Sequence, residues 1–293
     1  MFEKKLLTSV VFAASTLLTI SPLASAGSIS KADKSALIEV VNSRSDDAKA
    51  RDNSRHPIET LSFFKIKPGM TVAEALPGGG WYSNILANYL GEEGSLYGLN
   101  YNDDVWPRFG FFPQEFIDQR IAATKKFPEL VQGFTDAKIN SAGYTFNTVP
   151  ASLNKTVDRV LFIRALHNLN RFDKEANSLT EALATTHRIL KDDGYVGVVQ
   201  HQLQESAAEK GADGSRGYLK LSTVKEAFAK AGFKLVASSD INANSKDKPS
   251  DTDIVWRLPP SYNGAGEDAE KRKAVDAIGE SNRMTLLFKK VSK

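Results

Sequence analysis

A triple glycine between an apolar segment and a helical pattern most constrains what this chain can fold into. Residues 71–75 are apolar apart from Glu74, the glycines occupy positions 78–80, and a helical pattern runs from 82 to 90. The pattern predicts a strand, a tight loop and a helix. Glycines permit a positive φ and let a ligand approach without meeting a Cβ atom, while the free N–H groups of the helix face that ligand. A nucleotide-like ligand is expected here, and the alternative is a plain turn.

The first 26 residues form a separate unit. Lys4 and Lys5 precede an apolar run over residues 6–20, and small residues at 24–26 offer a cleavage site before Gly27. This is the pattern of a secretory signal peptide. The alternative, a membrane anchor, is disfavoured because the run is shorter than the roughly 20 residues that span a bilayer. We expect a periplasmic or secreted protein with no stable membrane insertion after cleavage.

Charge and composition narrow the function classes. The chain has 38 Lys and Arg against 35 Asp and Glu, spread along the sequence, and no cysteine. Without a basic stripe, a nucleic-acid surface is not expected. Thiol catalysis and thiolate metal sites are excluded. The length suits an N-terminal helical extension over residues 27–57 and one large α/β domain over 58–293, and the oligomeric state is not indicated.

Strand and helix patterns alternate along that domain. We expect strands at 72–75, 95–99, 130–134, 157–163, 195–199, 233–238 and 284–291, and helices at 31–42 (continued by 48–52), 57–64, 82–90, 111–127, 172–190 and 223–231, the last with Ser222 as N-cap and Gly232 just after its end. Alternation of this kind predicts a mostly parallel sheet. The polar and charged insertion at 242–281 lacks a regular crossover helix, so the last strand is expected to enter antiparallel.

Four motifs resemble a known family. They are Arg55-His56-Pro57, the glycine loop with its flanks from Glu74 to Tyr82, the run Val255-Trp-Arg-Leu-Pro-Pro-Ser, and Ile278-Gly-Glu-Ser-Asn-Arg-Met-Thr-Leu. With the strand order, they make the chain similar, over roughly residues 58 to 290, to class I S-adenosylmethionine-dependent methyltransferases, and most to predicted bacterial members that are exported. The resemblance implies a Rossmann-like three-layer α/β sandwich, a seven-stranded sheet with an antiparallel last strand, and methyl transfer from S-adenosylmethionine to a small-molecule acceptor.

The resemblance also implies which residues bind the cofactor. They are Glu74, Gly78, Gly79, Gly80, Asn100, Asp103, Asp136, Ala137 and Arg164. Two positions depart from the family pattern: Leu76 replaces a glycine, and Asn100 replaces the acid that holds the ribose hydroxyls. An amide lacks the charge-assisted strength of a carboxylate, so a low cofactor affinity is expected. Ser83 stands where a dinucleotide fingerprint needs glycine, which disfavours a nicotinamide enzyme. For Asp136, a plain turn or N-cap is an equal alternative.

Two histidines follow neighbouring strands and are the catalytic candidates. His167 comes after the strand at 157–163 and His201 after the next strand. Since ligands bind outside the carboxyl ends of such strands, both imidazoles are expected at one cleft. A histidine suits removal of the proton that an O–H or N–H acceptor loses. The alternatives are hydrogen bonds to loop carbonyls, or a metal site with Glu205. No tight ligand spacing supports the metal site, so no metal is expected.

Aromatic residues supply further candidates. Trp81 is placed to offer a π-face to a sulfonium or to pack under the sheet. Tyr218, Trp256, Arg257 and Tyr262 either line an acceptor pocket or belong to an insertion that covers a sheet edge. Two other functions stay open. One is a noncatalytic small-ligand binding protein on the same scaffold, and the other is a hydrolase or metal enzyme that uses the two histidines.

Overall fold

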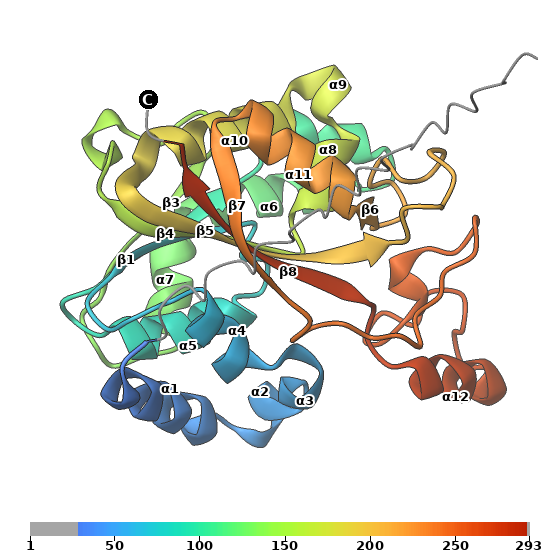
Figure 1. Cartoon of the computed structure of the whole chain (residues 1–293), viewed down its shortest axis with the longest axis horizontal. Helices are drawn as coiled ribbons and strands as arrows, with labels where there is room; N and C mark the ends of the chain where they lie inside the picture. Colours follow the sequence, from blue (N-terminus) through green and yellow to red (C-terminus); the bar gives the residue numbers. More distant parts are fainter. Residues whose placement is uncertain (1–28, 292–293) are drawn as a thin grey trace, which may run out of the picture.

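An eight-stranded mixed sheet forms the centre of the protein (Figure 1). The structure is a computed structural model that describes residues 29–291, so the expected signal peptide lies outside the described residues. The strands are β1 (Thr71–Ala75), β2 (Ser95–Asn100), β3 (Asn140–Thr145), β4 (Val157–Ile163), β5 (Leu190–Leu203), β6 (Leu219–Lys220), β7 (Phe233–Ser239) and β8 (Arg283–Lys290). Their order is β3-β2-β1-β4-β5-β8-β7, and the short β6 pairs with β5.

The direction of the last strand follows the expectation from sequence. The strands β1 to β5 pair in parallel. By contrast, β8 runs antiparallel to both β5 and β7. The predicted fold class, a Rossmann-like sandwich with an antiparallel last strand, is confirmed, and the two-residue β6 is an addition to the seven expected strands.

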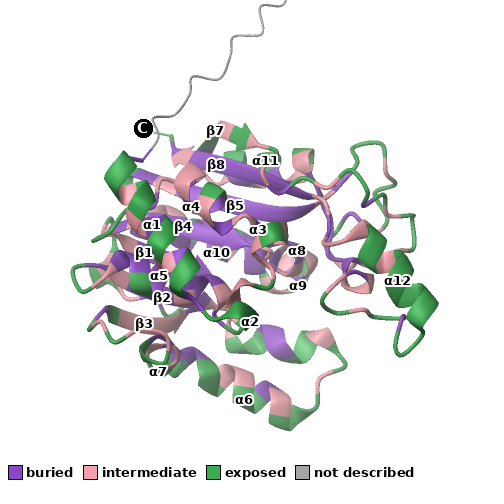
Figure 2. Ribbon diagram, turned by 90° about the horizontal axis from the view of Figure 1, so that it is seen from below, coloured by how far each residue is buried: buried purple, intermediate pink, exposed green. Residues whose placement is uncertain are grey.

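Helices cover both faces of the sheet, and the strands between them are buried (Figure 2). The helices are α1 (Lys31–Ser43), α2 (Asp46–Lys49), α3 (Asp52–Arg55), α4 (Pro57–Phe63), α5 (Trp81–Leu90), α6 (Gln114–Lys125), α7 (Phe127–Gln132), α8 (Leu166–Arg171), α9 (Asp173–Ala176), α10 (Ser178–Ile189), α11 (Leu221–Lys230) and α12 (Ala269–Ile278), with 3-10 turns η1 (Asp103–Phe109), η2 (Ala151–Leu153) and η3 (Val255–Arg257). One core cluster lies under α1, α4, α5 and α7, and the other lies under α6, α8, α10 and α11. None of the helices in this described part is long and apolar enough to span a membrane.

The predicted third strand is wrong, and the error moves two site candidates. Residues 130–134 belong to α7 and its end, while β3 forms at Asn140–Thr145. A short apolar run fits a helix or a strand equally well, and Pro128 stands in the first turn of α7, where proline is tolerated. Asp136 and Ala137 therefore precede β3 and lie toward its amino end, at the edge of the sheet opposite the ligand side. Their predicted contact with the cofactor is not supported.

Three helix predictions need smaller corrections. The helix expected at 172–190 is divided at Asn177, which has a φ of 51°, into α9 and α10. Residues 48–52 do not continue α1, because Arg44 is extended and Ser45 starts a new helix by accepting a hydrogen bond from the backbone of Ala48. Ser222 is not an N-cap, since α11 begins at Leu221. Gly232, with a φ of 82°, does follow the end of α11 as expected.

Candidate functional site

Two adjacent cavities open at the carboxyl ends of the strands. The first, of about 540 Å³, lies between the ends of β1, β4 and β5 and the insertion at 242–281. The second, of about 440 Å³, lies between the end of β2 and the helices α6 and α7. Leu76, Pro77 and Gly78 line both. Of the predicted site residues, Glu74, Gly78, Gly79, Arg164, His167 and His201 line the first cavity, and Gly78 and Asn100 line the second.

The loop between the cavities uses its glycines for different reasons. At Gly80 the φ is 77°, and a Cβ atom would lie 2.7 Å from the ring of Phe134, so packing requires glycine there. A Cβ atom at Gly79 would meet nothing within 4 Å, so this position forms an open cradle. Leu76 has a φ of 53°, which is the left-handed conformation that glycine favours. Leu76 thus stands where the family pattern has glycine, while the backbone keeps the left-handed turn.

Glu74 is a buried acid behind this loop. Its side chain accepts a hydrogen bond of 2.6 Å from the Ser83 hydroxyl, and the residue is 4% exposed. Burial raises the pKa of Glu74 from 4.5 to about 7, against the opposing effects of Ser83 and the positive charge of Arg164. The carboxyl group is therefore partly protonated near neutral pH, where a surface glutamate would be fully ionised.

We expect Glu74→Gln to change how stability depends on pH. The folded-state pKa of Glu74 lies above its unfolded value, so its stabilising contribution is complete below pH 4.5 and is lost as the pH rises through 7. The shift corresponds to about 3 kcal/mol. Urea denaturation at pH 5 and pH 8 should show the variant gaining roughly that much free energy of unfolding relative to the wild type. The contributions of other titrating groups are the same in both proteins and cancel in the difference. The surface variant Glu93→Gln is the control. A pH-independent difference would contradict a protonated Glu74.

The two histidines meet in the first cavity, as predicted from sequence. His167 lies in the first turn of α8 and His201 near the end of β5, with ring centroids 5.4 Å apart. Gln200 sets the orientation of His167: its Nε2 donates to two backbone carbonyls, so its Oε1 accepts from His167 Nδ1 at 3.3 Å. That arrangement leaves the Nε2 lone pair of His167 to accept a proton.

Burial keeps both imidazoles neutral. It lowers the pKa of His167 to about 4, with Arg164 adding to the effect and the Gln200 hydrogen bond opposing it. Burial also lowers the pKa of His201, helped by the neighbouring His167 and by the positive charge of Arg164. His201 Nδ1 lies 2.5 Å from the Ser281 hydroxyl. A neutral imidazole is the form that accepts a proton, but the lowered pKa makes His167 a weaker base than an ordinary histidine.

Other predicted residues lie outside this arrangement. Asp103 is exposed and lines neither cavity. The amide of Asn100 is already engaged, since it donates to Thr124 Oγ1 at 3.0 Å and accepts from the backbone of Tyr101. Glu205 bonds to Ser222 at the start of α11, away from the histidines. Among residues 29–291, no group of three or more His, Asp or Glu side chains could hold a metal ion.

The aromatic candidates divide in a similar way. Trp256 lines the first cavity, with its ring 5.8 Å from that of His167. Tyr218 and Arg257 instead form a buried network with Asp247. The ring of Trp81 is covered by the guanidinium groups of Arg44 and Arg55, at 5.1 and 4.5 Å from its centroid. It is thus already engaged in cation–π contacts with the protein itself.

Sequence reasoning missed two polar residues that line the first cavity, Glu280 and Ser281, and a buried one beside it, Gln200. Gln200, Glu280 and Ser281 each contact a histidine or an arginine there. Gln200 stands beside a chosen histidine, at the end of a strand, which is a usable signal. Glu280 and Ser281 lie in the motif that starts at Ile278. Their distance along the sequence from β4 does not predict that this motif lies near the carboxyl end of that strand.

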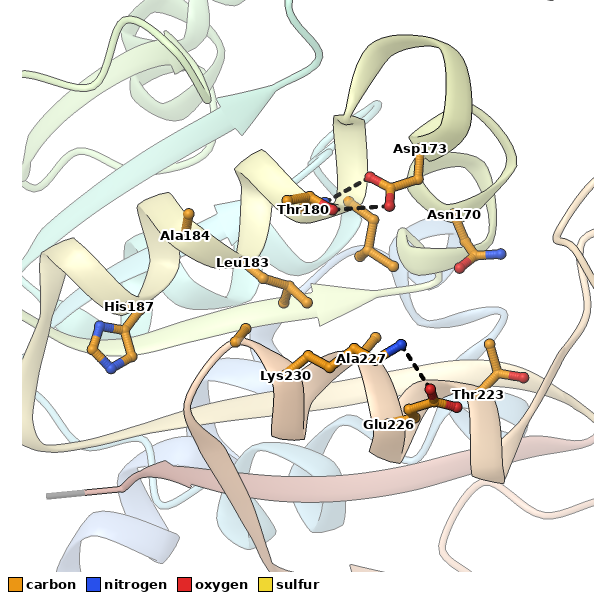
Figure 3. A pocket seen from close by; sticks show the side chains of 12 residues that line it. Asn170, Asp173, Thr180, Leu183, Ala184, His187, Thr223, Glu226, Ala227 and Lys230 are labelled. Atoms are coloured by element: carbon orange, nitrogen blue, oxygen red, sulfur yellow. Dashed lines mark hydrogen bonds and ion pairs between the residues drawn. The ribbon is translucent and has the colours of Figure 1, made fainter. Parts of the chain in front are cut away.

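A third depression lies elsewhere. It is a groove of about 600 Å³ between α10 and α11, lined only by residues of α8 to α11 and their ends. Figure 3 shows the side chains that line it. Four of its polar side chains bond in pairs: Asp173 accepts from Thr180 at 2.9 Å, and Lys230 pairs with Glu226 at 2.7 Å. The groove lacks the strand ends, the glycine loop and the two central histidines, so we place the site in the first two cavities.

Comparisons with known proteins give similarity at the level of structure. A methyltransferase of Aquifex aeolicus described as S-adenosylmethionine-dependent is 16% identical with a TM-score of 0.43, covering 72% of this chain and 93% of its own. A chain of the Haloferax volcanii complex of the Trm112 activator with a methyltransferase is 16% identical, with a TM-score of 0.48 and coverage of 88% and 98%. The 1,6-didemethyltoxoflavin-N1-methyltransferase of Burkholderia thailandensis, solved with S-adenosylhomocysteine, is 11% identical, with a TM-score of 0.45 and coverage of 88% and 87%. No protein-family model and no curated protein sequence matches the chain.

Proposed function

We propose that this protein transfers a methyl group from S-adenosylmethionine to a small-molecule acceptor. The observation that carries the proposal is the open position at Gly79, which lines the first cavity together with a pair of neutral histidines and follows Gly78, a residue that lines both cavities. Both cavities have the volume of ordinary small-molecule sites. They lie outside the carboxyl ends of the parallel strands, where open α/β sheets bind their ligands.

The residues present fit such a cofactor. Gly78 and Gly79 would allow it to pass between the cavities without meeting a Cβ atom. The second cavity offers the apolar walls of Trp106 and Phe127, and the indole N–H of Trp106 has no hydrogen-bond partner in the described residues 29–291. An unpaired buried donor of this kind suits an acceptor atom on an adenosine. When bound, the cofactor supplies an electrophilic methyl group on a sulfonium.

The chain's own residues would then position the acceptor and move its proton. The hydrogen bond from His167 Nδ1 to Gln200 reserves Nε2 of the same ring for the O–H or N–H proton of the acceptor. Trp256 lines the cavity beside that ring and would contact an acceptor bound there. Holding the acceptor in line with the transferable methyl group provides the remainder of the rate enhancement.

Calorimetry with S-adenosylmethionine and S-adenosylhomocysteine tests the proposal. We expect both to bind to the protein, with low affinity because Asn100 replaces the ribose-binding acid and its amide is engaged internally. Absence of binding at millimolar ligand would refute the methyltransferase function. Binding without methyl consumption over a panel of acceptors would favour the noncatalytic binding protein instead.

A further inference from the structure

Four arginines lie at or next to the first cavity, and three of them, Arg51, Arg55 and Arg164, line it. Arg51 and Arg55 lie at the two ends of α3, Arg164 follows β4 and Arg283 begins β8. Glu280 is the carboxylate that most of them share: it pairs with Arg51, with Arg55 at 3.5 Å and with Arg283 at 3.1 Å. None of these five residues lines the second cavity. The single ionised carboxylate of Glu280 thus faces four guanidinium groups. These charges lie away from the second cavity, where the adenosine end of the cofactor would bind.

The positive charge of Arg164 is the least compensated among the four arginines. Its backbone N–H donates to Val199 at 2.6 Å, but its guanidinium makes no hydrogen bond or ion pair to any residue within 29–291. The side chain lines the first cavity. Burial lowers the pKa of Arg164 while the charge of Glu280 opposes the change, which indicates incomplete compensation. The other nearby acid, Glu74, is itself partly protonated because of its raised pKa.

The proposed cofactor does not reduce the net positive charge of the site. S-adenosylmethionine carries a carboxylate, an ammonium and a sulfonium, so it brings an excess of positive charge to the site. Burying an uncompensated charge costs several kcal/mol. The second molecule in the site is therefore the one that has to balance the arginines.

We propose that the methyl acceptor carries an oxyanion, a carboxylate or a phosphate, which binds Arg164 together with Arg51 and Arg55. The inference rests on the proposed methyl transfer and names the chemical class of its acceptor. The planar fork of a guanidinium matches both kinds of oxyanion. Arg164 follows β4 directly and precedes His167, in the first turn of α8, by three residues, so an acceptor held there by its anionic end has its remaining atoms beside the histidine pair.

Calorimetry on the protein saturated with S-adenosylhomocysteine tests this assignment. The probes are inorganic phosphate and glutarate, with glutaramide as the uncharged counterpart of glutarate, all at one ionic strength. We expect at least one of the two oxyanions to bind and glutaramide not to bind. Arg164→Met should weaken the oxyanion about 10- to 100-fold, the usual range for a lost charge-assisted hydrogen bond, and Arg164→Lys should weaken it less. Arg51→Met serves as a second variant if Arg164→Met fails to fold.

The outcomes separate the two proposals. Arg108→Met, which removes an exposed arginine paired with Asp104, is the matched control and should leave oxyanion binding unchanged. If S-adenosylhomocysteine binds but neither oxyanion does, or if the variants bind the oxyanion as the wild type does, the acceptor class is wrong and methyl transfer stands. If S-adenosylhomocysteine displaces the oxyanion, the arginines serve the cofactor's carboxylate, which also overturns the assignment. Oxyanion binding that Arg164→Met weakens, in a protein that does not bind S-adenosylhomocysteine, would support the anion site and refute methyl transfer.

Discussion

Gly79→Val is expected to weaken binding of S-adenosylhomocysteine about 100-fold or more while the protein stays as stable as the wild type. The backbone at Gly79 lies outside the left-handed region, and an added Cβ atom meets no protein atom within 4 Å. A valine side chain therefore fits the folded protein. It projects into the space that the cofactor would occupy, and overfilling a defined site costs about 1–3 kcal/mol or more. Calorimetry reports the affinity and thermal unfolding reports the stability.

Its neighbours in the loop show why position 79 is the informative one. A valine at Gly78 would be strained by the φ of 60°, and one at Gly80 would also approach the ring of Phe134 to 2.7 Å. We expect Gly80→Val to lower the unfolding temperature, so loss of binding in that variant would not locate the ligand. Unchanged affinity in a folded Gly79→Val protein would place the cofactor elsewhere.

The fold was largely predictable because its central strands carry strong local signals. The β-branched run of β4 was assigned with its bounds, and the polar insertion before β8 indicated the antiparallel strand. By contrast, β3 has the sequence Asn-Ser-Ala-Gly-Tyr-Thr, which carries little strand propensity. Its Gly143 is required by tertiary packing, since a Cβ atom there would lie 1.7 Å from the Thr124 carbonyl. Such a contact has no local pattern, so the strand was missed.

The site was predictable where residues follow a strand directly. His167 follows β4 and His201 lies near the end of the adjacent β5, which extends further than the expected strand at 195–199, and the topology alone brings them together. Asp136 was misplaced because its assignment depended on the wrong third strand. The arginine group has a different origin: α3, β4 and β8 are far apart in sequence, and only the folded chain places their charges around Glu280. Charge balance at a site is a property of tertiary structure, so sequence spacing does not predict it.

The insertion at 242–281 depends on one buried carboxylate. Asp247 has a fully buried side chain that accepts hydrogen bonds from the Tyr218 hydroxyl at 3.0 Å, Arg257 at 2.9 Å and the backbone N–H of Asn282 at 2.9 Å. These bonds join the loop before β6, the insertion and the approach to β8. The same insertion contributes Trp256 to the first cavity, and in Figure 1 its helix α12 lies to one side of the sheet. Its position therefore depends on contacts of this type.

Asp247→Ala is expected to lower the free energy of unfolding by about 3–5 kcal/mol, because it leaves the partly buried Arg257 and the Tyr218 hydroxyl without this acceptor. Urea denaturation measures the loss. The matched control is Asp104→Ala, which breaks an exposed pair with Arg108 and should cost at most about 0.5 kcal/mol. Since the insertion carries part of the cavity wall, ligand affinity should fall in Asp247→Ala even under conditions where the protein remains folded. If the loss of unfolding free energy is no larger than that of the control, apolar contacts such as Val255 against Tyr218 hold the insertion. The carboxylate of Asp247 would then only accept hydrogen bonds from groups that packing has already brought together.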